Sequence, residues 1–360
     1  MQGRGCVYSY GLGKNGELGN RKRNDREIIP FRVEGLPACI SAKAGGSFSL
    51  ALSVSGEIWA CGKGKSGRSG APDTIQFVRI SGLPRISQIS AGYWHSLALD
   101  EGGRVWSTGY NSYGQLGLGN TTDMPRFTLT DAIGKCISAG GHYSLLITES
   151  GVLLSCGTNK VSGHNENLSR FTQIPNLENV EFIDAGQIHA ACVSQGKVYT
   201  WGNNSWGQLG HSNLKNVVHP KEVPGLEGLQ LIAVSCSKGE KFGSTGCITQ
   251  DFRVFMWGCG YKGKLGLDSH WSHEDPADRQ VPELIANFNS DKIELGGIHS
   301  SSIFNGTLFT WGCGSDGRIG HPEVEGHRYL YKEPLPRPIA NIPKVLMISS
   351  SYYHNLVLTE

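Results

Sequence analysis

The sequence has little charge and no excess of one sign. Charged residues make up 18% of its 360 residues, and 33 Lys and Arg against 31 Asp and Glu give a formal net charge of +2. A chain without a strong net charge has no long-range field that attracts nucleic acid or an anionic membrane. We therefore expect neither nucleic acid nor a membrane as a direct partner.

Long apolar runs and paired cysteines are also missing. No apolar run approaches the roughly 18 residues that a transmembrane helix requires, and residues 1–10 lack the charged and apolar regions of a secretory signal. The ten cysteines are spread along the chain without a C-x-x-C pair, which excludes the usual zinc-ribbon and redox motifs. We predict reduced, buried thiols in a protein of the cytoplasm, the nucleus or both.

Motifs of covalent catalysis and cofactor binding are absent as well. The chain has no Gly-x-Ser-x-Gly nucleophile elbow. Gly-x-Gly-x-x-Gly begins at Gly11, Gly62, Gly258 and Gly312, but each copy lies inside a β repeat with no following helix, so these glycines are predicted to form turns that require positive φ. We expect a protein without enzyme activity, cofactor or metal.

Histidine recurs at one position of four repeats, at His95, His189, His299 and His354. Positions about 50 residues apart around a ring do not form one metal site. We therefore predict that each of these histidines forms a structural hydrogen bond within its own repeat. Two further histidines, His270 and His273, are predicted to lie in a solvated loop.

Glycine, by contrast, is abundant: 50 of the 360 residues are glycine, about twice the share of an average soluble protein. Many of them mark a repeated segment that reads strand, glycine, loop, glycine. The leading glycines of its seven copies are Gly11, Gly62, Gly109, Gly157, Gly202, Gly258 and Gly312, at spacings of 45 to 56 residues. The fourth copy is the weakest, because its next glycine, Gly163, comes one position late.

A second segment alternates with the first and reads Ala-Gly-x-x-His-Ser, as in Ala91 to Ser96. Short strands at a fixed period, joined by glycine turns and without a helical period, are typical of radially repeated sheets. We predict an all-β fold, a seven-bladed β-propeller that forms a single domain over residues 1–360. Its ring is predicted to close by antiparallel pairing of residues 7–9 with residues 356–358, and residues 235–243 are predicted to form an irregular loop.

The two signatures together resemble the regulator of chromosome condensation repeat family. The resemblance rests on Trp201 to Gly210 and on Ala91 to Ser96, and it covers essentially the whole chain. It implies a disc-shaped propeller with two loop-lined faces. Members of the family include an exchange factor for the small GTPase Ran, a plant ultraviolet photoreceptor and ubiquitin-ligase modules, so the fold alone does not define the function.

Aromatic residues occupy loop positions that the repeat leaves free. Because these positions recur in each blade, they are predicted to gather on one face of the disc, and exposed aromatics are typical of protein-binding hot spots. The predicted partner-binding residues are Tyr93, Trp94, Tyr110, Tyr113, Trp206, Tyr261, Tyr352 and Tyr353. We expect an intracellular scaffold or adaptor that binds a protein partner of unknown identity through this face.

The alternative function is nucleotide exchange on a Ran-like small GTPase, with or without association with chromatin. The resemblance implies acidic side chains between the glycine and histidine of some repeats, and none of the six recognisable pairs contains one. Light sensing is a third interpretation, and it requires clustered tryptophans on a face. Five tryptophans are instead predicted in the core strand position, at Trp59, Trp106, Trp201, Trp257 and Trp311.

Overall fold

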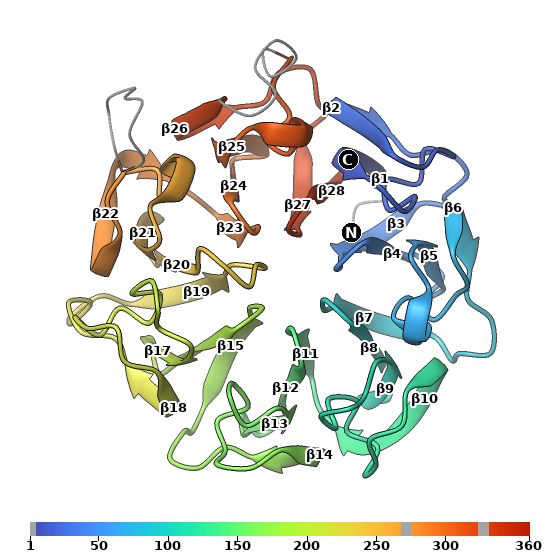
Figure 1. Ribbon diagram of the computed structural model, residues 1–360, viewed down its shortest axis with the longest axis horizontal. Coiled ribbons are helices and arrows are strands. Elements are labelled where there is room, and N and C mark those ends of the chain that lie inside the picture. The colour runs from blue at the N-terminus through green and yellow to red at the C-terminus, as the bar shows by residue number, and fades with distance from the viewer. Residues whose placement is uncertain (1–4, 268–275, 323–330) are drawn as a thin grey trace.

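The protein is a ring of seven four-stranded antiparallel sheets, or blades, arranged around a central axis (Figure 1). The structure is a computed structural model that describes residues 5–267, 276–322 and 331–360. Each blade runs from an innermost first strand near the axis to an outermost fourth strand. The predicted seven-bladed all-β architecture is confirmed.

Blades 1 to 4 follow one another along the chain. Blade 1 contains β3 (Cys39–Ala44), β4 (Phe48–Ser53), β5 (Ile58–Gly62) and β6 (Thr74–Arg79). Blade 2 contains β7 (Ile86–Ala91), β8 (His95–Asp100), β9 (Arg104–Gly109) and β10 (Met124–Ile133). Blade 3 contains β11 (Cys136–Ala139), β12 (Tyr143–Ile147), β13 (Leu153–Gly157) and β14 (Leu168–Gln173). Blade 4 contains β15 (Val180–Ala185), β16 (His189–Ser194), β17 (Lys197–Gly202) and β18 (Val217–Glu222).

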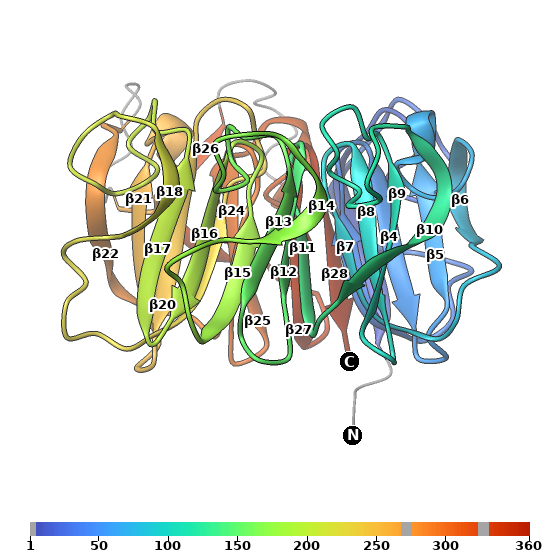
Figure 2. The same cartoon turned by 90° about the horizontal axis from the view of Figure 1, so that it is seen from below.

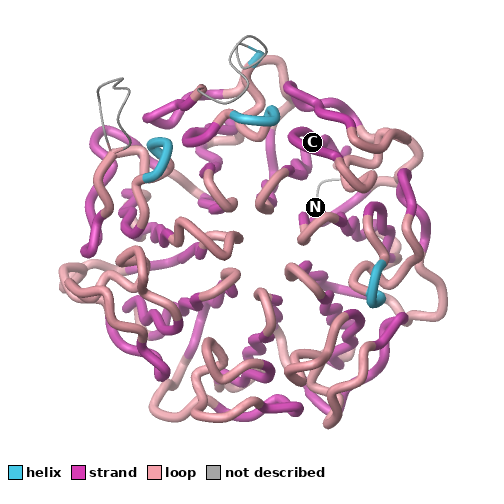
Figure 3. The backbone as a smooth tube through the Cα atoms, viewed as in Figure 1, coloured by secondary structure: helices cyan, strands magenta, loops and turns pink. Residues whose placement is uncertain are grey.

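Blades 5 to 7 complete the ring. Blade 5 contains β19 (Leu231–Cys236), β20 (Ser244–Thr249), β21 (Arg253–Gly258) and β22 (Arg279–Asn289). Blade 6 contains β23 (Lys292–Leu295), β24 (His299–Phe304), β25 (Thr307–Cys313) and β26 (Lys332–Pro338). Blade 7 contains β27 (Val345–Ser350), β28 (His354–Thr359), β1 (Cys6–Gly13) and β2 (Asp25–Arg32). The short 3-10 turns η1 (Lys65–Gly67), η2 (Tyr261–Gly263) and η3 (Ser315–Gly317) are drawn in cyan in Figure 3.

Blade 7 combines strands from the two ends of the chain and closes the ring. Strands β1 and β28 pair antiparallel, with Val7 opposite Leu358 and Ser9 opposite Leu356. This is the register predicted from the sequence. The closure is favoured because a sheet edge left open would expose unpaired backbone donors and acceptors.

The apolar core lies between the blades, as seven clusters with one at each junction of neighbouring sheets. The second strand of each blade is covered on both sides, and all six residues of β8 and of β16 are buried. A strand covered on both faces does not alternate polar with apolar residues. This explains why these segments read as continuous runs of small and apolar residues.

The leading glycines are required by both conformation and space. At Gly109, φ is +121°, and a Cβ atom would lie 2.6 Å from the Cα atom of His95 on the adjacent strand. Only glycine adopts this backbone conformation readily and permits such a close approach. The prediction that these glycines have structural roles with positive φ is confirmed at this position, and all seven have φ near 100°.

The four recurrent histidines connect neighbouring blades, whereas we predicted hydrogen bonds within each blade. The Nε2 atom of His95 lies 2.9 Å from the Ser144 hydroxyl of the next blade, and that hydroxyl donates to the Gln115 carbonyl. Since the hydroxyl proton is used there, Nε2 must be the donor to Ser144. His189, His299 and His354 bond to the following blade in the same way.

Burial lowers the pKa of each of these histidines to about 3. The Nδ1 atoms of His95, His189 and His299 are buried without a hydrogen-bond partner. Protonation of Nδ1 in any of these three rings would create a buried cation whose new N–H group has no hydrogen-bond acceptor. The histidines are therefore neutral structural groups at pH 7.

The tryptophans divide into two groups, which corrects the predicted set. Trp201, Trp257 and Trp311 are fully buried, and each indole donates to a backbone carbonyl of the preceding blade. Trp59 and Trp106 lie two residues earlier in their strands and remain partly exposed. All ten cysteines are free thiols, and eight of them are buried, as predicted.

Candidate protein-interaction face

Two sets of loops share one rim of the disc. The loops that follow the first strands carry the Ala-Gly-x-x-His signature, and those that follow the third strands carry the glycine-rich signature. Figure 2 shows both sets on one side, with the C-terminus at the opposite rim. All eight predicted binding residues belong to these loops, and each has a partly or largely exposed side chain.

The largest aromatic group lies over blades 2 and 3. Trp94 is 4.9 Å from Tyr93 and 6.3 Å from Tyr110, measured between ring centroids. The ring of His142 lies 6.3 Å from Trp94 and 5.0 Å from Tyr113. Four predicted residues are thus brought together, with the imidazole of His142 at the centre.

A second aromatic group lies over blades 4 and 5. The ring of Phe242 stacks on Tyr261 at 4.3 Å and lies 5.4 Å from Trp206. Phe242 belongs to the loop at residues 237–243, which has seven residues where the other blades have three. The irregular loop predicted here is thus an insertion that completes the group.

A third group consists of Tyr352 and Tyr353, with ring centroids 4.5 Å apart. The predicted residues therefore gather on one face but form three separate groups. Several are also packed against neighbouring loops. The ring of Tyr93, for example, lies where a Cβ on Gly46 would be.

Buried cations lie beneath two of these groups. The guanidinium of Arg68 is 4.3 Å from the Trp94 ring, and that of Arg318 is 5.3 Å from the Tyr353 ring. Each arginine is nearly inaccessible and donates to backbone carbonyls, those of Gly46 and of Tyr352 respectively. A cation held against an aromatic ring limits the motion of that ring. The rings of Trp94 and Tyr353 are therefore positioned by a buried cation before any partner binds.

Arg68 and Arg318 occupy the position at which two other repeats have glutamine, and Lys264 occupies it in blade 5. The Lys264 ammonium is fully buried and donates to the carbonyls of Phe242 and Gly297, at 2.6 and 2.7 Å. Burial lowers the pKa of Lys264 to about 8. Lys264 thereby anchors the inserted loop of blade 5 to the first loop of blade 6.

A hollow of about 670 Å³ opens on the same face over blades 3 and 4. Its walls include Tyr113, His142, Lys160 and Glu240. It forms where the loop between β13 and β14 has only ten residues, 158–167, while the corresponding loops of blades 2 and 4 have fourteen. In the sequence, this repeat was distinguished only by its weak signature, in which Gly163 comes one position late.

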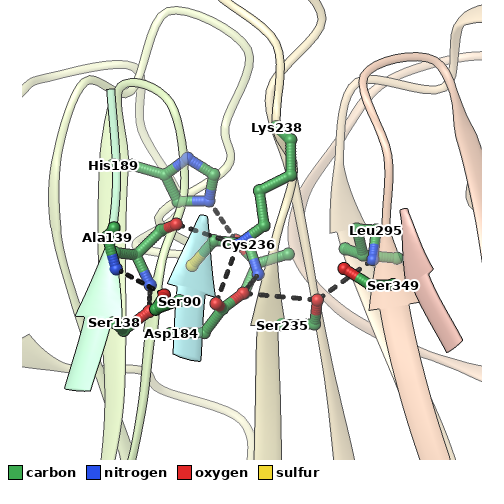
Figure 4. A network of polar contacts seen from close by, with 12 residues as sticks. Ser90, Ser138, Ala139, Asp184, His189, Ser235, Cys236, Lys238, Leu295 and Ser349 are labelled. Carbon is green, nitrogen blue, oxygen red and sulfur yellow. Dashed lines mark hydrogen bonds and ion pairs between the residues drawn. The ribbon is translucent and has the colours of Figure 1, made fainter. Parts of the chain in front are cut away.

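Around the axis, the blades are joined by a ring of polar contacts (Figure 4). In five junctions a side chain of the first strand accepts from a backbone N–H of the next blade: Ser90 from Ala139, Ser138 from Ala185, Asp184 from Cys236, Ser235 from Leu295 and Ser349 from Ala44. Asp184 also forms an ion pair with Lys238 of the inserted loop, at 2.8 Å. This pair fixes the base of the insertion at the axis.

Nearby carboxylates favour the charged form of Lys238. Burial by itself would lower the pKa of Lys238, but Asp184 and Glu294 outweigh it, so the pKa is raised above its ordinary value. The Lys238 ammonium also donates to the Ala185 carbonyl at 2.8 Å. The paired charges are therefore compensated by direct hydrogen bonds.

Sequence reasoning missed His142, Phe242 and the buried arginines. His142 follows Gly141 at a position where only a carboxylate was expected to have a function, and Phe242 lies in the repeat that lacks the Ala-Gly-x-x-His-Ser signature. The same insertion carries Glu240, so a carboxylate does occur in one of the loops after the first strands. The sequence signal that could have indicated this insertion was the unusual length of the segment between two recognisable strands.

Neither metal chemistry nor a membrane span can be assigned to the described residues. Within them, no three His, Cys, Asp or Glu side chains are placed to share a metal ion. No helix of residues 5–267, 276–322 or 331–360 is long and apolar enough to cross a membrane. His270 and His273 lie outside the residues that the structure describes.

These features define a seven-bladed propeller built from glycine-marked repeats. The family model of the RCC1-like domain matches residues 1–242, and that of the regulator of chromosome condensation (RCC1) repeat matches residues 253–301 and 305–358. The chain belongs to the regulator of chromosome condensation family.

Curated relatives share about three tenths of the aligned residues. The human E3 ubiquitin-protein ligase HERC2 is 29% identical over 61% of this chain and 5% of its own length. The Arabidopsis thaliana ultraviolet-B receptor UVR8 is 30% identical, over 62% of this chain and 50% of its own length. The mouse regulator of chromosome condensation is 31% identical, over 55% of this chain and 48% of its own length. The matches thus span half or less of these relatives.

Solved structures resemble the fold over nearly the whole chain. Human WBSCR16 superposes with a TM-score of 0.84 at 23% identity and covers 99% of both chains. Saccharomyces cerevisiae Prp20p, described with its binding to Gsp1p and histones, superposes with a TM-score of 0.86 at 18% identity and covers 98% of this chain and 91% of its own. At these identities the likeness concerns the fold.

Proposed function

We propose that this propeller is a non-catalytic interaction module that binds a partner protein through the loop-lined face. The observation that carries the proposal is the group of Tyr93, Trp94, Tyr110, Tyr113 and His142, partly exposed and held from below by a buried arginine. Aromatic side chains that are fixed before binding lose little conformational entropy in a complex, which favours their use as anchors.

The test is a comparison of captured partners between variants. Trp94→Ala combined with Tyr113→Ala removes two rings of this group without touching a blade core. Each anchor that becomes buried in a complex contributes about 2 kcal/mol or more, so the double variant should lose the main partner. Wild-type and variant chains of all 360 residues are used as bait in cell extract, and captured proteins are quantified by mass spectrometry.

Phe182→Ala provides the matched control, because Phe182 is an exposed aromatic residue of β15 outside the two loop sets. The partner should be retained by this variant and lost by the double variant. Equal capture by the double variant, at unchanged melting temperature, would show that the partner binds elsewhere.

Nucleotide exchange on a Ran-like GTPase is the second candidate, and Glu240 is the observation in its favour. Its carboxylate is exposed and forms no ion pair or hydrogen bond with the described residues. The family resemblance implies acidic side chains in the corresponding loops of several repeats, and Glu240 is a single such carboxylate. We therefore expect no exchange activity. The assay is the release of labelled GDP from Ran with stoichiometric propeller. A saturable acceleration that Glu240→Gln abolishes would replace the interaction module by an exchange factor.

A further inference from the structure

The hollow over blades 3 and 4 has the dimensions of a binding pocket. Its volume, about 670 Å³, lies within the range of roughly 300 to 1,000 Å³ of small-molecule sites. Part of its lining is apolar, from Val161, Ile188, Val217 and Val218. The rest is polar, and its donors and acceptors can be assigned from the hydrogen bonds that the same residues already make.

Two asparagines present amide NH2 groups as their free ends. The Oδ1 atom of Asn203 accepts from the Ser205 N–H at 3.0 Å and from the Gln208 side chain at 2.9 Å. The Oδ1 atom of Asn216 accepts from the Asn204 N–H at 2.9 Å. Because both carbonyl oxygens are engaged, the free groups on these two lining residues are donors.

Two further lining residues have polar groups without a partner. Gln187 is only 6% exposed, yet its side-chain amide makes no hydrogen bond with any described residue. The Nδ1 atom of His142 is buried and likewise unpaired, and burial lowers the pKa of this imidazole. A buried polar group without a partner is costly unless something else satisfies it. Both residues line the hollow. The Gln187 amide is open to it, so a bound molecule can bond to this group, whereas the Nδ1 atom of His142 has no accessible surface.

Two unpaired charges complete the lining. Lys160 and Glu240 are exposed, and neither forms an ion pair with a described residue. Lys160 and the two asparagine NH2 groups together favour a carboxylate. Glu240, on the insertion of blade 5, favours an N–H donor or a cation. A peptide offers both, since its backbone N–H groups flank an acidic side chain.

We propose that this hollow binds an extended segment of a partner protein and receives one aspartate or glutamate side chain. The carboxylate is held by Lys160 and by the amides of Asn203 and Asn216. The side-chain methylene groups lie against Val161 and Val217, and Gln187 bonds to the peptide backbone. The proposal rests on the interaction function above and names the chemistry of the segment that is recognised.

The test uses blocked tetrapeptides and the methyl NMR signals of the valines. Ac-Ala-Glu-Ala-Ala-NH2 is titrated into the full chain labelled at its valine methyl groups, and Ac-Ala-Gln-Ala-Ala-NH2 is the neutral probe. We expect the signals of Val161, Val217 and Val218 to shift and saturate with the acidic probe, with at least tenfold weaker binding of the neutral one. Lys160→Met should reproduce that tenfold loss with the acidic probe.

Lys215→Met is the matched control, since Lys215 is an exposed lysine of the neighbouring loop that does not line the hollow. It should bind the acidic probe as the wild type does. Equal binding of the two probes, saturation at other valines, or no shift at 10 mM probe would overturn the proposal. The interaction function is scored separately, because partner loss in the Trp94 and Tyr113 double variant is independent of Lys160.

Discussion

Mild acid is expected to destabilise the ring through the four histidines that connect neighbouring blades. Their pKa is lowered from 6.5 to about 3 in the folded protein, because burial disfavours the charged ring. Between these two pH values the unfolded chain binds protons that the folded chain does not. Stability therefore rises with pH in this window, and it is lost as the pH falls below about 6.5.

The size of the effect follows from the difference in bound protons. At pH 5.5, one unit below the unfolded pKa, each histidine favours unfolding by about 1.4 kcal/mol, and four together by about 6 kcal/mol. This is comparable with the whole stability of a typical domain, about 5 to 15 kcal/mol. Urea unfolding followed by tryptophan fluorescence between pH 7.5 and 5 measures the slope.

The decisive comparison is between His95→Gln and Ser144→Ala. The glutamine variant removes one titrating ring, so its slope should be lower than that of the wild type by about one proton, or about 1.4 kcal/mol per pH unit. The alanine variant removes the hydroxyl that accepts from His95 but keeps the ring, so stability should fall at every pH with an unchanged slope. Equal slopes for His95→Gln and the wild type would refute a buried neutral histidine at this position.

Two further outcomes are expected, one for the pairing of β1 with β28 that closes the ring and one for the ion pair of Asp184 and Lys238 near the axis. Deleting the residues after Tyr353 removes β28 and the buried Leu356 and Leu358, which should cost about 5 kcal/mol or more and lower the melting temperature in a single transition; an unchanged melting temperature would contradict the role of this strand. In a double-mutant cycle of Asp184→Asn and Lys238→Met, the coupling free energy should be about 1 to 3 kcal/mol, and a value near zero would show that the ion pair contributes nothing.

Much of the fold was predictable because its determinants are local. A glycine with φ near 100° and a strand buried on both faces each require a characteristic sequence motif in every repeat. Seven such repeats predict seven blades, and the motifs at the two ends of the chain predict the pairing that closes the ring. Contacts between blades were harder to predict from the sequence. The sequence gives the position of His95 in its repeat, but whether its ring reaches its own blade or the next depends on how the sheets are packed.

The candidate face was predictable only in outline. Positions such as Trp94 and Tyr113 could be placed on one rim, because the repeat determines where each loop emerges. Their division into three groups depends on residues outside the motif, above all on Phe242 in the insertion of blade 5. The hollow lies where the loop around Gly163 is four residues shorter than the corresponding loops of blades 2 and 4. A shorter loop introduces no characteristic residue type, so the sequence pattern did not predict the hollow.

The pairing of β1 with β28 also has a consequence for synthesis on the ribosome. The two strands are adjacent in the finished sheet but are separated by almost the whole chain, so their contact carries a large loop-closure cost. While the intermediate blades are being synthesised, the edge of β1 that will pair with β28 has no hydrogen-bonding partner. An uncovered edge invites pairing with other chains. Until β28 emerges, protection of that edge depends on chaperones or on the speed of translation.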